Sequence, residues 1–150
     1  MFKRLLLAFD GSIHSQKALV YAMRMSETLD ASLYLLHAYA PITSSSLLND
    51  EDEFLDQEKA EGLRVLAPAV RAAETTGIDV HPVIVEGPAP EAIARVAEEQ
   101  ACDLIVMGRR GLTSMGEALL GSVSDSVLRL TYLPVLMVHA APDETNFRVN

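Results

Sequence analysis

The chain has 150 residues, the size of one ordinary domain, and 49% of them are hydrophobic, which is enough for a sizeable core. Its 12 basic and 21 acidic residues give a formal charge of -9, which argues against binding to nucleic acid or to anionic lipid. A single cysteine excludes an intrachain disulfide, and no apolar run approaches the roughly 18 residues of a membrane span. The N-terminus has no signal-peptide cleavage pattern. We therefore expect a cytoplasmic protein that does not span a membrane and whose partners are proteins or small molecules.

Short apolar runs alternate with segments of helical period along the whole chain. Runs of four to eight apolar residues are typical of strands, and apolar residues that recur every three or four positions are typical of helices. In chain order we predict a strand at 5–9, a helix at 13–29, a strand at 32–38, a helix that begins in the acidic stretch after Asp50 and ends before Gly77, a strand at 80–86, a helix from Pro90, a strand at 103–107, a helix at 122–131 and a strand at 134–138.

Prolines and polar segments predict further details. Because Pro82 removes a backbone donor, we predict the third strand at an edge of the sheet, and Pro68 is a candidate kink in the second helix. The serine-rich and acidic residues 41–53 predict a flexible loop, and residues 141–150 predict a polar, frayed tail. No repeat or linker divides the chain, so residues 1–150 are predicted to form a single domain.

The alternation of strands and helices requires parallel strands joined by helical crossovers. We therefore predict an α/β fold of the Rossmann-like kind, with an open five-stranded parallel sheet and helices on both faces. In such sheets a ligand binds beyond the carboxyl ends of the strands, where the strand order reverses. The turns of interest are therefore those after Phe9, Ala38, Glu86 and Met107.

The turn after the fourth predicted strand is rich in glycine. It consists of Gly108-Arg109-Arg110-Gly111 and, after nine further residues, Gly121-Ser122-Val123 at the start of the last helix. Glycines let backbone N–H groups approach an anion, the helix N-terminus adds a positive dipole end, and Arg110 and the Ser122 hydroxyl can bind phosphate. Because glycines are also common in turns, a role in turn formation alone is the alternative. No lysine precedes Ser122 and no Gly-x-Gly-x-x-Gly follows the first strand, so neither a P-loop NTPase nor a dinucleotide dehydrogenase is expected.

Asp10 ends the first predicted strand. Its carboxylate can accept hydrogen bonds from a ribose or a base, or approach a metal bound to phosphates. The structural alternative is an Asx turn or a cap on the following helix, for which Ser12 and Ser15 are also candidates. His14 lies near Asp10 and Ser12 in sequence, but no nucleophile-elbow pattern is present, so a hydrolytic triad is not expected.

The histidines and the acidic stretch show no metal-site pattern. His14, His37, His81 and His139 lack zinc-ligand spacing, so packing or solvation is their expected role. The acidic run between Asp50 and Glu61 lacks the glycine and spacing of an EF-hand loop. We interpret it as a solvated face, with a lid or a surface for a basic partner as the functional alternative.

The pattern of glycines resembles the signature of the ATP-binding branch of the universal stress protein family, Gly-x2-Gly-x9-Gly-(Ser/Thr). The matching residues are Gly108, Gly111, Gly121 and Ser122. The likeness extends over essentially the whole chain, including Asp10-Gly11-Ser12, Glu86-Gly87 and Pro134-Val135-Leu136. The resemblance implies the strand order 3-2-1-4-5 and a homodimer formed largely through the fifth strand. It also implies ATP or a related adenine nucleotide in the cleft between strands one and four.

Carried over residue by residue, the resemblance implies a set of nucleotide contacts. Asp10 would contact the ribose or adenine, with Ala8 beside it, Ala38 would meet the adenine through its backbone, and Met107 would line the adenine pocket. The phosphates would be held by Gly108, Arg110, Gly111, Gly121, Ser122 and Val123. Members of the family often have a branched aliphatic residue where Ala38 stands, so the adenine wall is expected to be looser here.

These implications lead to one main functional hypothesis, a regulatory protein that binds ATP and acts as a nucleotide-dependent switch on a partner such as a membrane transport protein. Mg²⁺ or Mn²⁺ would accompany the nucleotide, and oligomers larger than a dimer are left open. Because no dedicated general base lies beside the glycines in sequence, at most slow hydrolysis of ATP is expected. The alternatives are an α/β enzyme that uses an adenine nucleotide, as a slow ATPase or an adenylating enzyme, and a structural dimer with an empty cleft.

Overall fold

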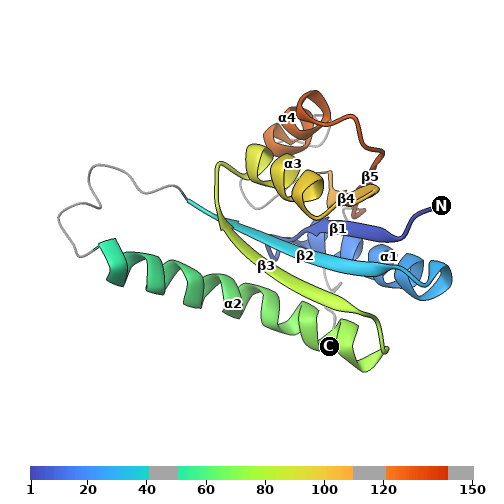
Figure 1. Ribbon diagram of the computed structural model, residues 1–150, viewed down its shortest axis with the longest axis horizontal. Coiled ribbons are helices and arrows are strands. Elements are labelled where there is room, and N and C mark those ends of the chain that lie inside the picture. The colour runs from blue at the N-terminus through green and yellow to red at the C-terminus, as the bar shows by residue number, and fades with distance from the viewer. Residues whose placement is uncertain (41–50, 110–120, 142–150) are drawn as a thin grey trace.

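The computed structural model describes residues 1–40, 51–109 and 121–141. Its elements are β1 (Arg4–Ala8), α1 (Ile13–Leu29), β2 (Ser32–Tyr39), α2 (Glu51–Thr75), β3 (Val80–Glu86), α3 (Ala89–Glu99), β4 (Leu104–Gly108), α4 (Ser122–Leu130) and β5 (Val135–Val138). The strands form one five-stranded parallel sheet in the order β3-β2-β1-β4-β5 (Figure 1). The predicted fold class and strand order are therefore confirmed, and the strand bounds differ from the prediction by at most one residue at either end.

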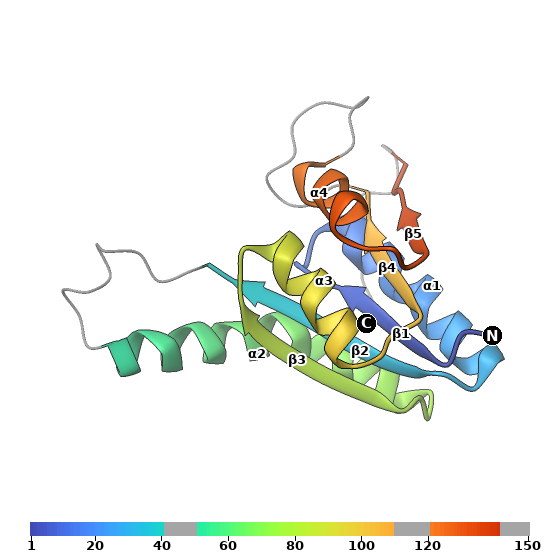
Figure 2. The ribbon, with the colours of Figure 1, turned by 45° about the horizontal axis from the view of Figure 1, so that its top comes forward.

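Helices cover both faces of the sheet. α1 and α2 lie against one face, and α3 and α4 lie against the other (Figures 1 and 2). Side chains of β1 alternate between the two cores, since Leu5 and Leu7 pack on the side of α1 and α2, whereas Leu6 packs with Ile93 of α3 and Val127 of α4. All three leucines of β1 are fully buried, as expected for the central strand of a parallel sheet.

The two edges of the sheet are β3 and β5. Pro82 lies in β3, so the edge position predicted from this proline is confirmed. β5 pairs with β4 along one side and consists of four apolar residues, Val135–Val138, of which the first three are half-buried. The fifth strand, at the edge that the family resemblance implied, is therefore apolar.

α2 begins at Glu51, in the acidic stretch where the helix was predicted to start. Residues 51–53, expected at the end of a flexible loop, are helical, so the loop prediction is wrong for these residues. The acidic side chains there favour the first turn of a helix, because the helix N-terminus carries partial positive charge. The rest of that predicted loop, residues 41–50, and residues 142–150 of the predicted tail lie outside the described part of the chain. The helix continues through Pro68 to Thr75, and Gly77, at φ +77°, ends it as predicted.

The connectivity gives the helices a common polarity. Each helix leaves the carboxyl end of one strand and returns to the amino end of the next, so all four described helices run opposite to the strands. Helix N-termini, with their partial positive charge, therefore gather at the carboxyl end of the sheet, and helix C-termini gather at the amino end. In the part of the chain that the structure describes, no helix combines the length and the apolar character needed to cross a bilayer.

Candidate functional site

The strand order reverses between β1 and β4, so the candidate site lies beyond the carboxyl ends of these two strands. The turn after β1 is held by its own side chains. The Asp10 carboxylate accepts the Ser12 N–H at 2.9 Å, and the Ser12 hydroxyl oxygen accepts the Ser15 N–H at 3.2 Å. Ser12 is thus the N-cap of α1, and Asp10 forms the Asx turn that was the structural alternative for this residue. Gly11 supports the turn with φ +81°.

Gly108, the last residue of β4, lies directly against the first turn of α1. A Cβ placed on Gly108 would come within 2.7 Å of the His14 Cβ and 3.0 Å of the Ser15 nitrogen. These contacts involve backbone as well as side chain, so a larger residue would push α1 away from the sheet. Glycine at this position is therefore explained by close packing of a helix on a strand, and this contact brings the turn of Asp10 next to the end of β4.

The segment that follows β4 returns to its starting point. Arg109 donates its N–H to the Val138 carbonyl at 2.8 Å, and the Gly121 N–H donates to the Arg109 carbonyl at 3.0 Å. The Ser124 hydroxyl lies within hydrogen-bond distance of the carbonyl oxygens of Gly108, at 3.1 Å, and Arg109, at 2.9 Å. The structure thus brings the two ends of the glycine motif close together, although more than nine residues separate them in the sequence. Arg110 and Gly111 of the motif lie outside the described residues.

Sequence reasoning missed Ser124. Its side chain is only 2% exposed, and it is the third residue of α4. A serine in the first turn of a helix usually signals capping of that helix, whereas here the hydroxyl binds carbonyls of the preceding strand and loop. No local pattern would have indicated this, because the partners lie 15 and 16 residues earlier in the chain.

In the part of the chain that the structure describes, no side chain caps the N-terminus of α4. Its N-cap is Gly121, which supplies no side-chain acceptor for the first N–H groups of the helix. The first N–H groups of a helix have no acceptor within the helix, so at this place an anion could accept their hydrogen bonds. Ser122 is exposed at the first helical position, Val123 is partly buried, and the Asp125 carboxylate is paired with Arg129 at 3.0 Å. The arrangement can therefore hold a negatively charged group.

The remaining residues that were predicted to contact the nucleotide lie on one face of the sheet. Ala8 is in register with Met107 of β4 and with Leu36 of β2, and Ala38 lies two residues beyond Leu36. All of them belong to the face that α3 and α4 cover, because alternate residues of a strand point to the same side. Ala8 and Ala38 are partly buried. Met107 is 3% exposed, and its side chain packs in the core.

Two histidines join distant segments at this end of the sheet. His14 Nδ1 accepts the Ala140 N–H at 3.0 Å, and its ring stacks on His139 with the centroids 5.3 Å apart. His37 Nδ1 lies 3.1 Å from the Phe9 carbonyl oxygen, which it can only approach as a donor. Packing, the role expected for the histidines, is thus observed for these three. Among the described residues no group of three or more histidine, cysteine or acidic side chains is placed to hold a metal.

The fold and these turns define a doubly wound α/β protein with an anion-accepting helix N-terminus at the reversal of strand order. The chain belongs to the universal stress protein family, whose family model matches residues 1–139. A relative, universal stress protein YxiE of Bacillus subtilis, is 36% identical over 147 residues, which cover 92% of this chain and 99% of the relative.

Solved structures agree with this assignment. The structure of protein MJ0577 of Methanocaldococcus jannaschii matches with a TM-score of 0.85 at 29% identity, over 94% of this chain and 98% of that one. A universal stress protein in complex with cAMP matches with a TM-score of 0.74 at 27% identity, over 93% of this chain and 99% of that one. The resemblance found in the glycine motif thus extends to the fold.

Proposed function

We propose that this protein binds an adenine nucleotide, ATP, beyond the carboxyl ends of β1 and β4. The observation that carries the proposal is the uncapped N-terminus of α4, which the Gly121 and Ser124 hydrogen bonds hold against the end of β4. Free N–H groups and a positive dipole end favour phosphate at such a place. The related universal stress protein that was solved in complex with cAMP supports an adenine nucleotide as the class of ligand.

The proposed contacts fall into two groups, those with the adenine and ribose and those with the phosphates. Asp10 binds the ribose or adenine, Ala8 and Ala38 border the adenine, and Met107 forms the floor beneath it. The phosphates are held by Gly108, Arg110, Gly111, Gly121, Ser122 and Val123, with Mg²⁺ or Mn²⁺ accompanying ATP. At Gly108, glycine serves packing on α1, so the proposed phosphate contact there is made by the backbone.

The proposed role is that of a regulatory switch in the cytoplasm. The turns that would bind the nucleotide also carry hydrogen bonds to β5, since Arg109 donates to the Val138 carbonyl. Because β5 is an apolar edge strand, it favours pairing with a second copy of the chain. Nucleotide binding at this site would therefore influence the proposed dimer, and through it a partner such as a membrane transport protein.

A charge change at Ser122 tests the nucleotide site. Ser122→Asp adds a carboxylate at the N-terminus of α4, which favours the helix but repels phosphate. We expect its melting temperature to equal or exceed that of the wild type, while its affinity for ATP, measured by isothermal titration calorimetry, falls about tenfold or more. Ser122→Asn is the matched neutral control and should bind ATP nearly as the wild type does. Wild-type affinity in Ser122→Asp would exclude phosphate from this helix terminus.

A second experiment tests the switch. Sedimentation velocity of the wild-type protein with and without ATP should show a dimer whose population or shape depends on the nucleotide. A monomer under both conditions would contradict the proposed dimer, and an unchanged dimer would contradict the proposed coupling to ATP.

A further inference from the structure

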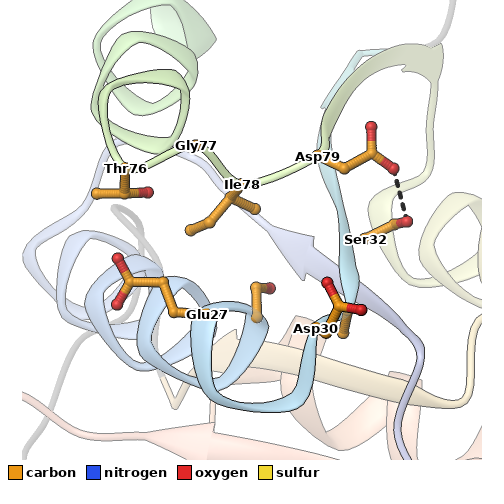
Figure 3. Close-up of a pocket in the computed structure, with 9 residues that line it drawn as sticks. Glu27, Asp30, Ser32, Thr76, Gly77, Ile78 and Asp79 are labelled. Atoms are coloured by element: carbon orange, nitrogen blue, oxygen red, sulfur yellow. Dashed lines mark hydrogen bonds between the residues drawn. The ribbon is translucent and has the colours of Figure 1, made fainter.

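A cavity of about 420 Å³ lies at the amino end of the sheet, on the side of α1 and α2 and far from the glycine motif. Its walls come from the last turn of α1, the start of β2, and the turn between α2 and β3 (Figure 3). Figure 3 shows Glu27 of α1 and its C-cap Asp30 on one side, Thr76 and Ile78 on the other, and the Ser32–Asp79 hydrogen bond at its edge. A cavity of this size is within the range of small-molecule sites.

The cavity is strongly negative. It is lined by the carboxylates of Glu27, Asp30 and Asp79, and none of the described residues that line it is basic. The C-termini of α1 and α2 both lie here, and neither helix has a basic residue in its last turn. Their partial negative charges therefore add to those of the carboxylates.

The charged groups around the cavity leave this negative field largely uncompensated. The Lys3 ammonium donates to the Leu29 carbonyl at 3.0 Å, where it offsets part of the α1 dipole. The Asp79 carboxylate accepts the Ser32 hydroxyl at 2.7 Å and lies 2.9 Å from His81 Nε2. These hydrogen bonds, that of Ser32 most, lower the pKa of Asp79, so this side chain is ionised at neutral pH. Glu27 and Asp30 have no ion-pair partner among the described residues.

An unpartnered buried hydroxyl lies in the same wall. Ser26 lines the cavity and is 2% exposed, yet its Oγ has no hydrogen-bond partner among the described residues. A buried hydroxyl that makes no hydrogen bond is unfavourable, so such groups are rare unless a ligand or water completes their hydrogen bonds. The Ser26 oxygen can accept a hydrogen bond from a cationic N–H group.

The spacing of these groups selects the kind of cation. No three acidic, histidine or cysteine side chains in the described chain are close enough to share a metal ion. Glu27 lies in α1 and Asp30 is its C-cap, whereas Asp79 lies across the cavity next to β3. A ligand that reaches them needs several positive groups along an extended, flexible chain, and a terminal primary ammonium can donate up to three hydrogen bonds.

We propose that this cavity binds a linear polyamine, with one ammonium group between Glu27 and Asp30 near the Ser26 hydroxyl and another near Asp79. The site is separate from the proposed nucleotide site, because it lies at the opposite end of the strands. The polyamine adds positive charge at two helix C-termini that have no basic residue in their own last turns.

Titration of the wild-type protein with spermidine, followed by isothermal titration calorimetry at constant ionic strength, tests this proposal. We expect one saturable site per chain. The double variant Glu27→Gln, Asp30→Asn should bind spermidine about tenfold or more weakly, because it loses two charge-assisted hydrogen bonds. Asn is chosen at position 30 because it tolerates the left-handed backbone found there, with φ 51°. Ser26→Ala should also weaken binding, by several-fold.

The matched control is Asp56→Asn, Glu58→Gln, which removes the same charge from the acidic side of α2. Since the whole chain carries a charge of -9, general attraction of polyamines to an acidic surface would weaken both double variants equally. That result would overturn the proposal, as would wild-type affinity in either cavity variant. Urea unfolding of each variant checks that the fold is retained.

Backbone amide shifts of the wild-type protein provide an independent readout. Spermidine should shift the amides of residues 26–32 and 76–79 and leave those of 121–124 unchanged. Shifts confined to other parts of the chain would overturn the assignment to this cavity. Competition by Ca²⁺ with equal affinity would also overturn it, because the site would then be one for a compact metal ion.

Discussion

The two ends of the sheet have opposite electrostatic character. At the carboxyl end no described side chain caps the N-terminus of α4, where we propose that phosphate binds, whereas at the amino end the C-termini of α1 and α2 lie beside Glu27, Asp30 and Asp79. The positive character of the carboxyl end comes from topology, because every helix in a parallel α/β fold runs opposite to the strands. The acidic side chains at the amino end come from the sequence and not from topology, and carboxylates at helix C-termini oppose the stability of those helices. An uncapped helix N-terminus and acidic side chains at helix C-termini both reduce stability. Their presence supports the ligand binding that we propose at each end.

The two ends also differ in packing. Gly108, at the carboxyl end, has no room for a side chain, whereas a Cβ on Gly77, at the amino end, would meet nothing within 4 Å. The first glycine is required by its neighbours and the second by its own backbone, at φ +77°.

Gly108→Ala tests this contrast and should have the largest effect. The added methyl group collides with the first turn of α1, so we expect a loss of about 2–3 kcal/mol in the free energy of unfolding. Gly77→Ala, where only the left-handed backbone opposes the substitution, should lose about 1 kcal/mol. Urea unfolding of both variants measures the difference. Equal losses would show that crowding at the carboxyl end is not the reason for Gly108.

Substitutions at Asp10 separate turn formation from ligand binding at the carboxyl end. Asp10→Asn keeps an oxygen that can accept the Ser12 N–H but removes the charge, whereas Asp10→Ala removes both. We expect Asp10→Ala to lose about 1 kcal/mol of stability and Asp10→Asn much less. If Asp10 binds the nucleotide by its charge, both variants should lose ATP affinity, measured by calorimetry. Loss of affinity in Asp10→Ala alone would indicate that the turn, and not the carboxylate charge, matters.

A reversed charge at the amino end should increase the stability of the protein, whereas the substitutions at the carboxyl end decrease it. Glu27→Lys places a cation in the last turn of α1, where it complements the helix dipole, so we expect a gain of about 0.5 kcal/mol in stability. Glu27→Gln should give a smaller gain. Thermal unfolding at low salt measures both. A destabilised Glu27→Lys variant would mean that Lys3, at the Leu29 carbonyl, already compensates this end of the helix.

The smallest expected effect concerns pH. The hydrogen bonds of Ser32 and His81 lower the pKa of Asp79 from 3.8 in the folded protein. A carboxyl whose pKa is lower in the folded state stabilises the fold above its unfolded pKa, and that stabilisation is lost as the pH falls through the folded value. Ser32→Ala should raise the pKa of Asp79 toward its ordinary value, and Ser32→Thr should preserve the lowered value. NMR titration of the carboxyl carbon measures this shift, and no change in Ser32→Ala would contradict the assigned cause.

Much of the fold could be predicted from local patterns. Strands such as β4 are short continuous apolar runs, and Gly77 and Pro82 are local signals whose consequences do not depend on distant residues. Residues 51–53 were assigned to both the predicted loop and the predicted helix, because the same acidic residues suit a solvated loop and the first turn of a helix. The strand order came from family resemblance, since periodicity does not specify which parallel strands are neighbours.

For the candidate site, the glycine spacing predicted the chemistry but not its structural basis. Sequence marked Gly108 and Gly121 as important, yet only the structure showed that Gly108 packs against α1 and that the Arg109 carbonyl binds the Gly121 N–H. Ser124 and the pairing of His14 with Ala140 had no sequence signal. The cavity between Glu27 and Ile78 was equally hidden, because the residues that line it are about fifty positions apart.

The sequence by itself determined the alternation of strands and helices, the parallel sheet, and hence the end of the molecule at which helix N-termini gather. These properties depend on local periodicity and on the handedness of chain connections. The tertiary structure alone decided which side chains meet across the sheet: Gly108 with His14, Ser124 with Arg109, and Glu27 and Asp30 across a cavity from Ile78. Such contacts depend on register and on packing distances of a few ångströms, which no pattern along the chain encodes.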